Sequence, residues 1–278
     1  MMLAAVLEKD SFLYKEVMNS PLWVAEEKYD GERLMFQYKN KKVSPLSRRG
    51  NQKKLWWLES VQLPFDIILD GEVYREGATS TDVVHLLATQ EQDLNYAIFD
   101  ILEIGEIDLK ILPYAFRRLI LATVWHEFFR ENSRIVLSTR RKDKEQFYQE
   151  VVSKGGEGVV LKDIRSSYEE SRSSSWLKLK KEETFDVVIT SAKLKLGTKA
   201  AEEGKLMLFY GYWDKFRKNY KEAGSLGVAV DPSEANSFLF KVAEVKGYFR
   251  YPTGAIRHPH LIRFREDKSP QECVLTDV

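Results

Sequence analysis

The pattern of short β-rich segments changes near residue 186, and this change constrains the fold more than any other feature of the sequence. Before that point, apolar β-rich runs alternate with turns and with candidate helices. After it, the chain reads as strand–turn units up to residue 278. Short strands at close, regular spacing are typical of a small all-β barrel. We therefore expect two domains, one over residues 1–186 and one over residues 187–278.

Two segments of the first domain have the apolar spacing and end signals of helices. Residues 113–129 begin with Pro113, which is favoured in the first turn of a helix. Residues 144–154 are followed by Gly155 and Gly156, which are typical of a helix end. The expected strands are 23–27, 33–38, 66–69, 96–102, 159–161 and 176–179 in the first domain, and 186–193, 205–213, 220–226, 241–249 and 255–264 in the second. The second set fits an oligonucleotide-binding (OB) fold.

Composition excludes several classes of protein. The one cysteine, Cys273, excludes an internal disulfide and a multi-cysteine zinc or iron–sulfur site. The four histidines do not have metal-ligand spacing. The longest apolar run, residues 119–125, is too short to cross a bilayer, and residues 3–7 lack the basic region of a signal peptide. We expect a soluble, cytoplasmic protein without a membrane partner.

The net charge of +1 does not by itself indicate a nucleic-acid partner, but its distribution is uneven. Residues 1–186 carry a balance of −3, whereas residues 187–278 carry +4. Basic residues cluster in four segments: 39–54, 140–144, 178–181 and 215–221. A single cluster of this kind is more often a solvated face than a binding site.

Lys28 is the first candidate for chemistry. It follows an expected strand and precedes the tight turn at Asp30 and Gly31. Neighbouring structure at such a position can desolvate the amine and lower its pKa, which a lysine nucleophile requires. The alternative is an ordinary hairpin turn with surface charges, because Asp-Gly turns are common.

Four further segments carry charged or aromatic residues at strand ends: 69–72, 96–100, 155–162 and 176–180. Glu72 follows an apolar strand, and Glu157 lies in a glycine-rich entry to another strand. Lys178 and Lys180 alternate with leucines, so both project from one face of their strand. Two cations on one face repel each other unless an anion lies between them, and phosphate is the obvious anion. Each segment alone has a structural alternative.

Together and in this order, the segments resemble the nucleotidyltransferase superfamily of ATP-dependent DNA ligases, RNA ligases and mRNA capping enzymes. Residues 28–33 match the nucleophile motif Lys-x-Asp-Gly-x-Arg, and residues 47–50 resemble the Ser-Arg segment of DNA ligases. Residues 257–268 are similar to the closing motif, Arg-x-Asp-Lys with its upstream strand. The resemblance runs from about residue 22 to 272. It implies an α+β nucleotidyltransferase domain, with ATP-grasp-like antiparallel sheets and helices, followed by an OB-fold barrel.

The resemblance also implies roles for individual residues. Lys28 would attack the α-phosphorus of ATP and form a lysyl–AMP intermediate. The implied catalytic residues are Lys28, Asp30, Arg33, Lys178, Lys180, Arg265, Asp267 and Lys268. The implied nucleotide-binding residues are Glu26, Lys28, Arg33, Arg48, Glu72, Phe99, Glu157, Lys178 and Lys180. Glu72 and Glu157 would hold Mg²⁺, for which Mn²⁺ could substitute.

Within these sets, the roles differ in kind. Lys178 and Lys180 would contact the α-phosphate, and Arg33 the ribose or the acceptor end. Phe99 would stack on adenine and Glu26 would contact its edge, while Arg48 would bind the 5′-phosphate of a nick. Residues of the closing motif, Arg265, Asp267 and Lys268, would cover the pyrophosphate.

Four of the residues singled out have structural alternatives. Asp30 is expected to shape its turn rather than perform chemistry. Phe99 and Trp176 could belong to the core, and Lys162 could be a solvated strand end.

Among the superfamily members, residues 262–270 look most like a DNA ligase. The expected partner is nicked double-stranded DNA and the expected state is a monomer, in a bacterial, phage or viral context. An RNA ligase, a guanylyltransferase of mRNA capping and a non-catalytic DNA-binding protein remain alternatives. The turn at residues 214–219 looks too short for a hairpin that encircles DNA, so basic loops at 39–54, 193–199 or 215–221 would have to grip the backbone.

Overall fold

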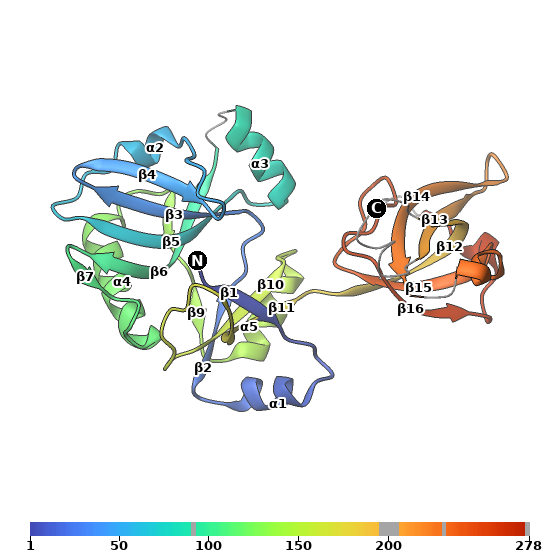
Figure 1. Cartoon of the computed structure of the whole chain (residues 1–278), viewed down its shortest axis with the longest axis horizontal. Coiled ribbons are helices and arrows are strands. Elements are labelled where there is room, and N and C mark those ends of the chain that lie inside the picture. Colours follow the sequence, from blue (N-terminus) through green and yellow to red (C-terminus); the bar gives the residue numbers. More distant parts are fainter. Residues whose placement is uncertain (90–92, 195–205, 230–231, 276–278) are drawn as a thin grey trace. The chain divides into compact units, whose positions relative to one another are not determined.

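The chain forms two compact units, Met1–Lys180 and Lys181–Val278. The computed structural model describes residues 1–89, 93–194, 206–229 and 232–275 (Figure 1). The division between the units lies six residues before the boundary expected near residue 186, a position that falls inside strand β12 (Glu183–Leu194). The first residues of that strand pair with β15 (Val242–Gly247), Glu183 with Gly247 and Asp186 with Glu244. They therefore belong to the second unit.

The first unit contains two sheets, and the first of them has five strands in the order β1-β11-β10-β2-β9. Their bounds are β1 (Leu3–Val6), β11 (Arg172–Lys180), β10 (Gly158–Asp163), β2 (Trp23–Glu27) and β9 (Arg140–Arg141). One face packs against helices α1 (Phe12–Asn19) and α5 (Lys144–Ser153). The core between them includes Val17, Phe147, Leu161 and Leu179. Because side chains alternate along a strand, the residues between these core positions point to the opposite face.

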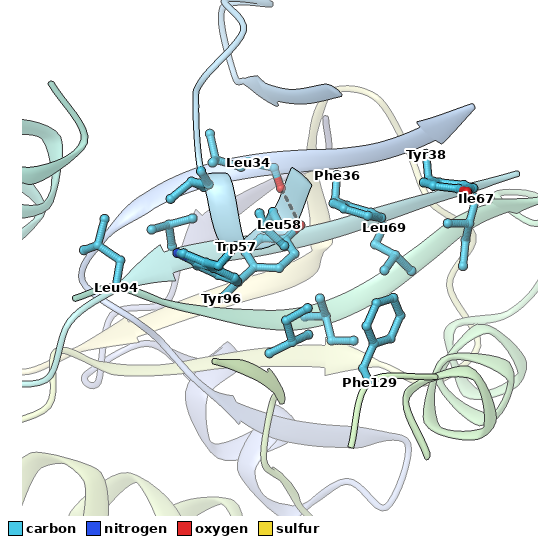
Figure 2. Close-up of a cluster of buried hydrophobic side chains, with 14 of the residues drawn as sticks. Leu34, Phe36, Tyr38, Trp57, Leu58, Ile67, Leu69, Leu94, Tyr96 and Phe129 are labelled. Atoms are coloured by element: carbon cyan, nitrogen blue, oxygen red, sulfur yellow. Dashed lines mark hydrogen bonds between the residues drawn. The ribbon is translucent and has the colours of Figure 1, made fainter. Parts of the chain in front are cut away.

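The second sheet of the first unit has six strands and a larger core. Its order is β4 (Lys42–Ser47), β3 (Glu32–Lys39), β5 (Ile67–Tyr74), β6 (Asn95–Ile104) and β7 (Ile107–Asp108), with β8 (Ile135–Leu137) paired to β6. The helices α2 (Trp56–Glu59), α3 (Ser80–Thr89) and α4 (Tyr114–Phe128) supply further core residues. Figure 2 shows this core, in which the rings of Phe36 and Phe129 meet edge to face at 6.4 Å. The Tyr96 hydroxyl donates to the Leu34 carbonyl at 2.9 Å, so its polar end is satisfied.

The described residues of the second unit form a five-stranded sheet in the order β14-β13-β12-β15-β16. The remaining bounds are β13 (Leu206–Asp214), β14 (Asn219–Val228) and β16 (His260–Arg265), with short 3₁₀ helices η1 (Pro232–Phe238) and η2 (Pro270–Glu272). All its pairings are antiparallel. Its core is built from alternate strand residues such as Val187, Leu208, Leu226 and Val245.

Both helices expected from the sequence are confirmed as α4 and α5, and Pro113 lies directly before α4. The strand expected over residues 255–264 is wrong at its start, because β16 begins at His260. Residues 255–257 pair locally instead: Arg257 donates its backbone N–H to Phe249, and Tyr251 donates to Ala255. Among the described residues, no helix combines the length and the apolar character that a membrane span needs.

Candidate active site

A cavity of about 260 Å³ opens in the first unit, on the face of the β1-β11-β10-β2-β9 sheet that faces away from α1 and α5. Seven of the residues expected from the sequence line it, namely Glu26, Lys28, Arg33, Arg48, Glu72, Phe99 and Lys178. The remaining lining residues are Leu3, Ala4, Glu27, Tyr29, Val160, Lys162, Arg172 and Trp176. The pairing register of the strands explains why these residues lie together. Val160 of β10 pairs with Glu26 of β2 on one side and with Lys178 of β11 on the other. These three side chains therefore share one face.

Glu157 joins two lysines at the edge of this cavity. Lys28 donates a hydrogen bond from Nζ to Glu157 Oε2, and Lys180 Nζ lies 2.8 Å from Oε1. The carboxylate is 9% exposed, and the Lys28 side chain is 22% exposed. A carboxylate in this position holds the Lys28 amine in place and is the nearest acceptor for its proton.

Positive charge is concentrated around these groups. Burial lowers the pKa of Lys178, and the neighbouring cations Lys180, Arg172 and Lys28 lower it further. Each of these cations disfavours the charged form of Lys178. A bound phosphate would relieve this repulsion, so the cavity has the electrostatics of an anion site.

Glu72 is a second carboxylate in the cavity and lies opposite Arg33 in the β3–β5 pairing. Burial raises the pKa of Glu72 to about 8, although Lys28 and Arg33 act in the opposite direction. Its carboxyl group is therefore mostly protonated at neutral pH. Among the described residues, no group of three or more His, Cys, Asp and Glu side chains is arranged to hold a metal ion.

Glu26 belongs to a buried polar network beside the cavity. Its carboxylate, 1% exposed, accepts hydrogen bonds from Lys162 Nζ at 2.8 Å, from Ser138 Oγ at 2.9 Å and from the Tyr114 hydroxyl. Burial opposes its ionisation, but Lys162 and Arg118 hold the pKa of Glu26 below its usual value. The interpretation of Lys162 as a solvated strand end is wrong, because its side chain is 2% exposed.

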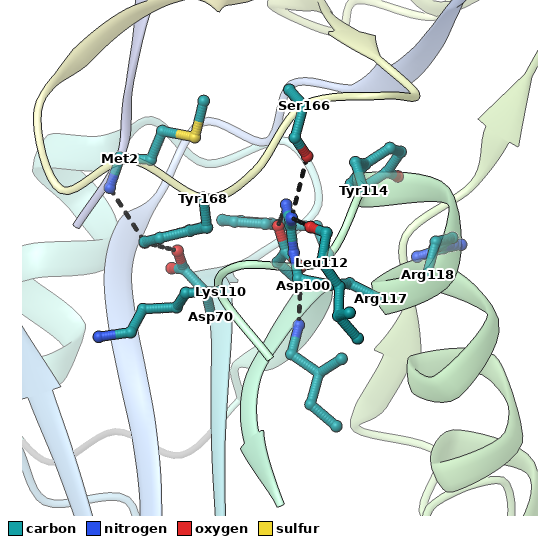
Figure 3. Close-up of polar contacts among 12 residues, drawn as sticks. Met2, Asp70, Asp100, Lys110, Leu112, Tyr114, Arg117, Arg118, Ser166 and Tyr168 are labelled. Atoms are coloured by element: carbon teal, nitrogen blue, oxygen red, sulfur yellow. Dashed lines mark hydrogen bonds and ion pairs between the residues drawn. The ribbon is translucent and has the colours of Figure 1, made fainter. Parts of the chain in front are cut away.

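Arg33 is anchored by a bidentate ion pair. Its Nε and Nη2 donate to the two oxygens of Asp70 at 2.9 and 2.6 Å. Tyr168 also donates to Asp70, at 2.6 Å, and receives a hydrogen bond from the backbone of Met2 (Figure 3). Burial opposes the charge of Arg33, but Asp70 raises its pKa. This arrangement fixes the guanidinium at the cavity wall.

Phe99 reaches the cavity because of an irregularity in strand β6. Asp70 pairs with Asp100 and Gly71 with Ile98, so Phe99 lies at the shift in register. Its ring meets Trp176 edge to face at 6.1 Å and lies 4.7 Å from Lys162 Nζ. The next residue, Asp100, forms a fully buried ion pair with Arg117 at 2.8 Å (Figure 3).

The closing-motif residues lie in the second unit and form an ion-pair cluster of their own. Arg265 Nη1 and Lys268 Nζ both donate to Asp186 Oδ2 at 2.8 Å. Arg265 also pairs with Asp267, with Nη2 at 2.6 Å from Oδ2. Asp186 was not identified from the sequence, although an acid at the edge of an apolar strand was a usable signal.

Residues 1–180 match the family model described as the ATP dependent DNA ligase domain. The chain belongs to this family. The match covers the whole first unit, including the cavity and both lysines that contact Glu157.

The chain is similar to curated DNA ligases. The DNA ligase of Methanosphaerula palustris is 29% identical to it, over 89% of this chain and 51% of the relative. The DNA ligase of Methanocorpusculum labreanum is 25% identical over 89% of this chain and 52% of the relative. The chain therefore spans about half the length of these curated relatives.

Solved structures show the same fold. The ligase domain of M. tuberculosis LigD aligns with a TM-score of 0.58 at 22% identity, over 98% of this chain and 97% of that chain. A Lig E DNA ligase aligns with a TM-score of 0.71 at 16% identity, over 95% of this chain and 99% of that chain. At these identities the likeness concerns the fold alone.

Several cavity residues of this ligase-family chain were not identified from the sequence. Leu3 and Ala4 reach the cavity because β1 pairs in parallel with β11, which places Leu3 beside Arg172. No local signal marks a pairing between such distant segments. Lys162 lies two residues after Val160 on the strand face that the cavity uses, but its buried partner Glu26 is 136 residues away and has no local signal.

Glu157 and Lys180 were also expected at the site, but neither lines the cavity. Glu157 contacts Lys28, which does line it, and Lys180 contacts Glu157. Asp30 lies in the turn between β2 and β3 and does not line it either. Of the basic loop at 193–199, residues 195–199 lie outside the described part of the chain.

Proposed function

We propose that this chain is an ATP-dependent DNA ligase that seals nicks between a 3′-hydroxyl and a 5′-phosphate in duplex DNA. The observation that carries the proposal is the placement of Lys28 at an anion-binding cavity, in contact with Glu157 and close to Lys178 and Lys180. The family match supports the reaction class. Solved structures of mycobacterial DNA ligase D and of the bacteriophage T7 ligase contain ATP, which supports ATP as the nucleotide.

In the first step, the Lys28 amine forms a bond to the α-phosphorus of ATP while the bond to pyrophosphate breaks. The amine must first lose a proton, and Glu157 Oε2 is the acceptor in contact with it. Lys178 and Lys180 neutralise the charge on the phosphate oxygens, which is the main demand of phosphoryl transfer. Arg33, whose guanidinium is held by Asp70, would contact the ribose or the acceptor strand.

Phe99 and the buried Glu26–Lys162 pair form the wall of the cavity that would receive the base. Phe99 offers a ring face for stacking on adenine. Both oxygens of Glu26 already accept hydrogen bonds, so a contact with the adenine edge would be shared with these partners.

In the later steps, AMP moves from Lys28 to the 5′-phosphate of the nick, and the 3′-hydroxyl then displaces AMP to close the backbone. Arg48 lines the cavity and would bind the 5′-phosphate. Arg265, Asp267 and Lys268 would cover the pyrophosphate, and Asp30 would shape the turn that carries Lys28.

Mg²⁺ fits the carboxylates of Glu72 and Glu157, which are hard oxygen donors, and Mn²⁺ would substitute. The raised pKa of Glu72, about 8, means that a cation would displace a proton there near neutral pH. When bound, the ion neutralises charge on the phosphate oxygens.

The second unit fits an OB fold. In its sheet, β12, the first strand along the chain, lies in the centre, and β14 and β16, the third and fifth strands, lie at the edges. This is the strand order of a five-stranded Greek-key barrel that has been opened out flat. The two edge strands β14 and β16 approach each other, as barrel closure requires. We assign Met1–Lys180 as the adenylyltransferase domain, Lys181–Val278 as the OB-fold domain, and the protein as a monomer that binds nicked DNA.

The test is a sealing assay on a duplex with one labelled nick. The protein with ATP should join a 5′-phosphate nick and leave a 5′-hydroxyl nick open, and GTP should not replace ATP. Lys28→Ala should abolish joining because it removes the nucleophile. Lys154→Ala is the matched control, since Lys154 is 72% exposed and lies outside the cavity. Joining of nicked RNA alone would indicate an RNA ligase, and nucleotide transfer from GTP would indicate a capping enzyme.

A further inference from the structure

Tyr168 is the one buried residue in the segment 164–171, which joins β10 to β11. Its side chain is 5% exposed, whereas the other residues of this segment are exposed or half-buried. The Tyr168 backbone N–H donates to the Lys110 carbonyl at 2.8 Å, and its ring meets Trp176 edge to face at 5.9 Å. These contacts fix the direction of the ring, whose hydroxyl reaches Asp70 on β5 (Figure 3).

The Tyr168 hydroxyl has a single proton, and the partners of the hydroxyl determine where that proton points. The Met2 N–H at 3.0 Å and Arg33 Nη2 at 3.4 Å can only donate. The proton is therefore directed at the third partner, Asp70 Oδ2, at 2.6 Å. Burial raises the pKa of Tyr168, so the hydroxyl keeps this proton at neutral pH.

The Asp70 carboxylate is held from two sides. It is inaccessible to solvent, and among the described residues Tyr168 is its only hydrogen-bond donor apart from Arg33. Because the Arg33 side chain is long, it could move together with the carboxylate and does not define the direction of the pair by itself. The Tyr168 hydroxyl supplies the second fixed point that a rigid arrangement requires.

The guanidinium of Arg33 has five N–H groups, and the surrounding contacts engage four of them. Nε donates to Asp70 Oδ1, Nη2 donates to Asp70 Oδ2 and to the Tyr168 hydroxyl, and Nη1 donates to the Met2 carbonyl at 2.5 Å. The second N–H of Nη1 has no acceptor in the part of the chain that the structure describes. Since Arg33 lines the cavity, this N–H is the one available to a ligand oxygen.

The kind of oxygen follows from charge and geometry. Asp70 compensates the charge of Arg33, and only one N–H is available. A phosphate group is typically bound by an uncompensated cation, often through two parallel hydrogen bonds. A compensated, single donor suits an uncharged oxygen instead, and a sugar oxygen is of this kind. The sugar is either the ribose of the nucleotide or the 3′-terminal sugar of the acceptor strand.

We propose that Tyr168 is a positioning residue for the ligase reaction. Its hydroxyl sets the direction of the Asp70 carboxylate and, through it, of the Arg33 N–H that meets the sugar oxygen. The inference rests on the proposed function, because that function supplies the sugar.

The experiment compares the whole wild-type protein with Tyr168→Phe, Arg33→Lys and the double variant Tyr168→Phe/Arg33→Lys. Tyr14→Phe is the matched control, since the Tyr14 hydroxyl also donates to a carboxylate, that of Glu145, but Tyr14 does not line the cavity. The maximal rate and KM are measured for two reactions. The first is AMP-adduct formation with ATP, and the second is joining of a nicked duplex whose 5′-phosphate already carries AMP.

Tyr168→Phe should lower the maximal rate about tenfold with KM unchanged, because a misdirected donor affects the reacting geometry more than binding. The loss should fall on adduct formation if the oxygen belongs to the ribose, and on joining if it belongs to the acceptor strand. The double variant should be no slower than Arg33→Lys, since Tyr168 acts through Arg33. Tyr14→Phe should match the wild type.

Wild-type rates in both reactions of Tyr168→Phe would overturn the inference. A double variant about tenfold slower than Arg33→Lys would also overturn it, because Tyr168 would then act independently of Arg33. Urea unfolding checks that each variant is folded. If Tyr168→Phe is not, Asp70→Asn takes its place, since it keeps the size of the side chain and weakens the acceptor. That variant should show the same loss of rate, and a wild-type rate would contradict the inference.

Failure of the inference is distinguishable from failure of the proposed function. A wild type that forms the AMP adduct and joins the nick, beside an equally active Tyr168→Phe, refutes only the role of Tyr168. A folded wild type that forms no adduct and joins no nick refutes the proposed function, and the inference with it.

Discussion

At the scale of single residues, the cavity wall contains a buried charge pair, Glu26 and Lys162, each almost completely inaccessible to solvent. Two charges removed from water carry a desolvation cost, which their mutual attraction and hydrogen bonds offset. Ser138 and Tyr114 donate to the same carboxylate, so its hydrogen-bonding capacity is largely filled. The pair stabilises the fold only while both members are present.

Lys162→Met should therefore destabilise the protein by about 3–5 kcal/mol, because Glu26 would remain buried without its closest cation. Arg118 would remain, but its Nη1 lies 4.0 Å from the carboxylate. Urea unfolding measures the change. The double variant Glu26→Gln/Lys162→Met should lose less than the sum of the two single variants, since their effects are coupled.

Lys154→Met is the control for this series, because Lys154 is 72% exposed and should change stability by less than about 0.5 kcal/mol. Equal stability of Lys162→Met and wild type would mean that the buried pair does not form.

The residues that line the cavity show which site residues can be predicted from the sequence and which cannot. Lys28, Glu72 and Lys178 were identified because each stands at a fixed offset in a motif, and all three line the cavity. Lys162 was misread because its burial depends on Glu26, 136 residues away. Nothing next to Lys162 in the sequence indicates that partner, so a lysine at a strand end resembles a solvated one.

At the scale of elements, the close approach of β10 to β11 places Glu157 beside Lys180. Gly158 begins β10 with φ of +137°, and a Cβ there would lie 2.1 Å from the Leu179 carbonyl oxygen. Lys28 N–H also donates to the Gly158 carbonyl at 2.9 Å. Glycine is required at this position both for its backbone conformation and for the contact between strands.

Gly158→Ala should destabilise the protein by about 2–5 kcal/mol, since it combines backbone strain with a steric clash. It should also slow AMP-adduct formation, because the strand that carries Glu157 would shift. Gly77→Ala is the matched control: its φ is also positive, at +73°, but no atom lies within 4 Å of the added Cβ. That variant should lose only about 1–2 kcal/mol. Similar losses in urea unfolding would contradict the role assigned to the strand contact.

The two helices that the sequence predicted agree closely with the structure, whereas α1, α2 and α3 were not predicted. Residues 113–129 and 144–154 have local signals at both ends, and α4 and α5 agree with them closely. The strand expected at 255–264 was placed too early because alternation alone cannot distinguish pairing with β15 from the local pairing of Arg257 with Tyr248 and Phe249. The register shift at Phe99 likewise has no sequence signature.

At the scale of the whole molecule, the two units have separate hydrophobic cores, and the change in strand pattern along the sequence reflects them. The boundary was expected near residue 186 because the first strand of the second domain was expected to begin there, whereas β12 begins at Glu183. In the structure, Glu183 and Asp186 are strand residues of β12, and Asp186 holds both Arg265 and Lys268. The proposed nucleophile, Lys28, therefore lies in one unit, and the cations Arg265 and Lys268 lie in the other.

The proposed reaction depends first on covalent attachment of AMP to Lys28. It is tested by the intact mass of the whole protein after incubation with ATP and Mg²⁺, beside Lys28→Ala and the exposed control Lys154→Ala. GTP and NAD are run in parallel. We predict one AMP adduct on the wild type and on Lys154→Ala with ATP only, and none on Lys28→Ala. An adduct that persists in Lys28→Ala, or a folded, AMP-free wild type that forms no adduct with ATP, would contradict the account.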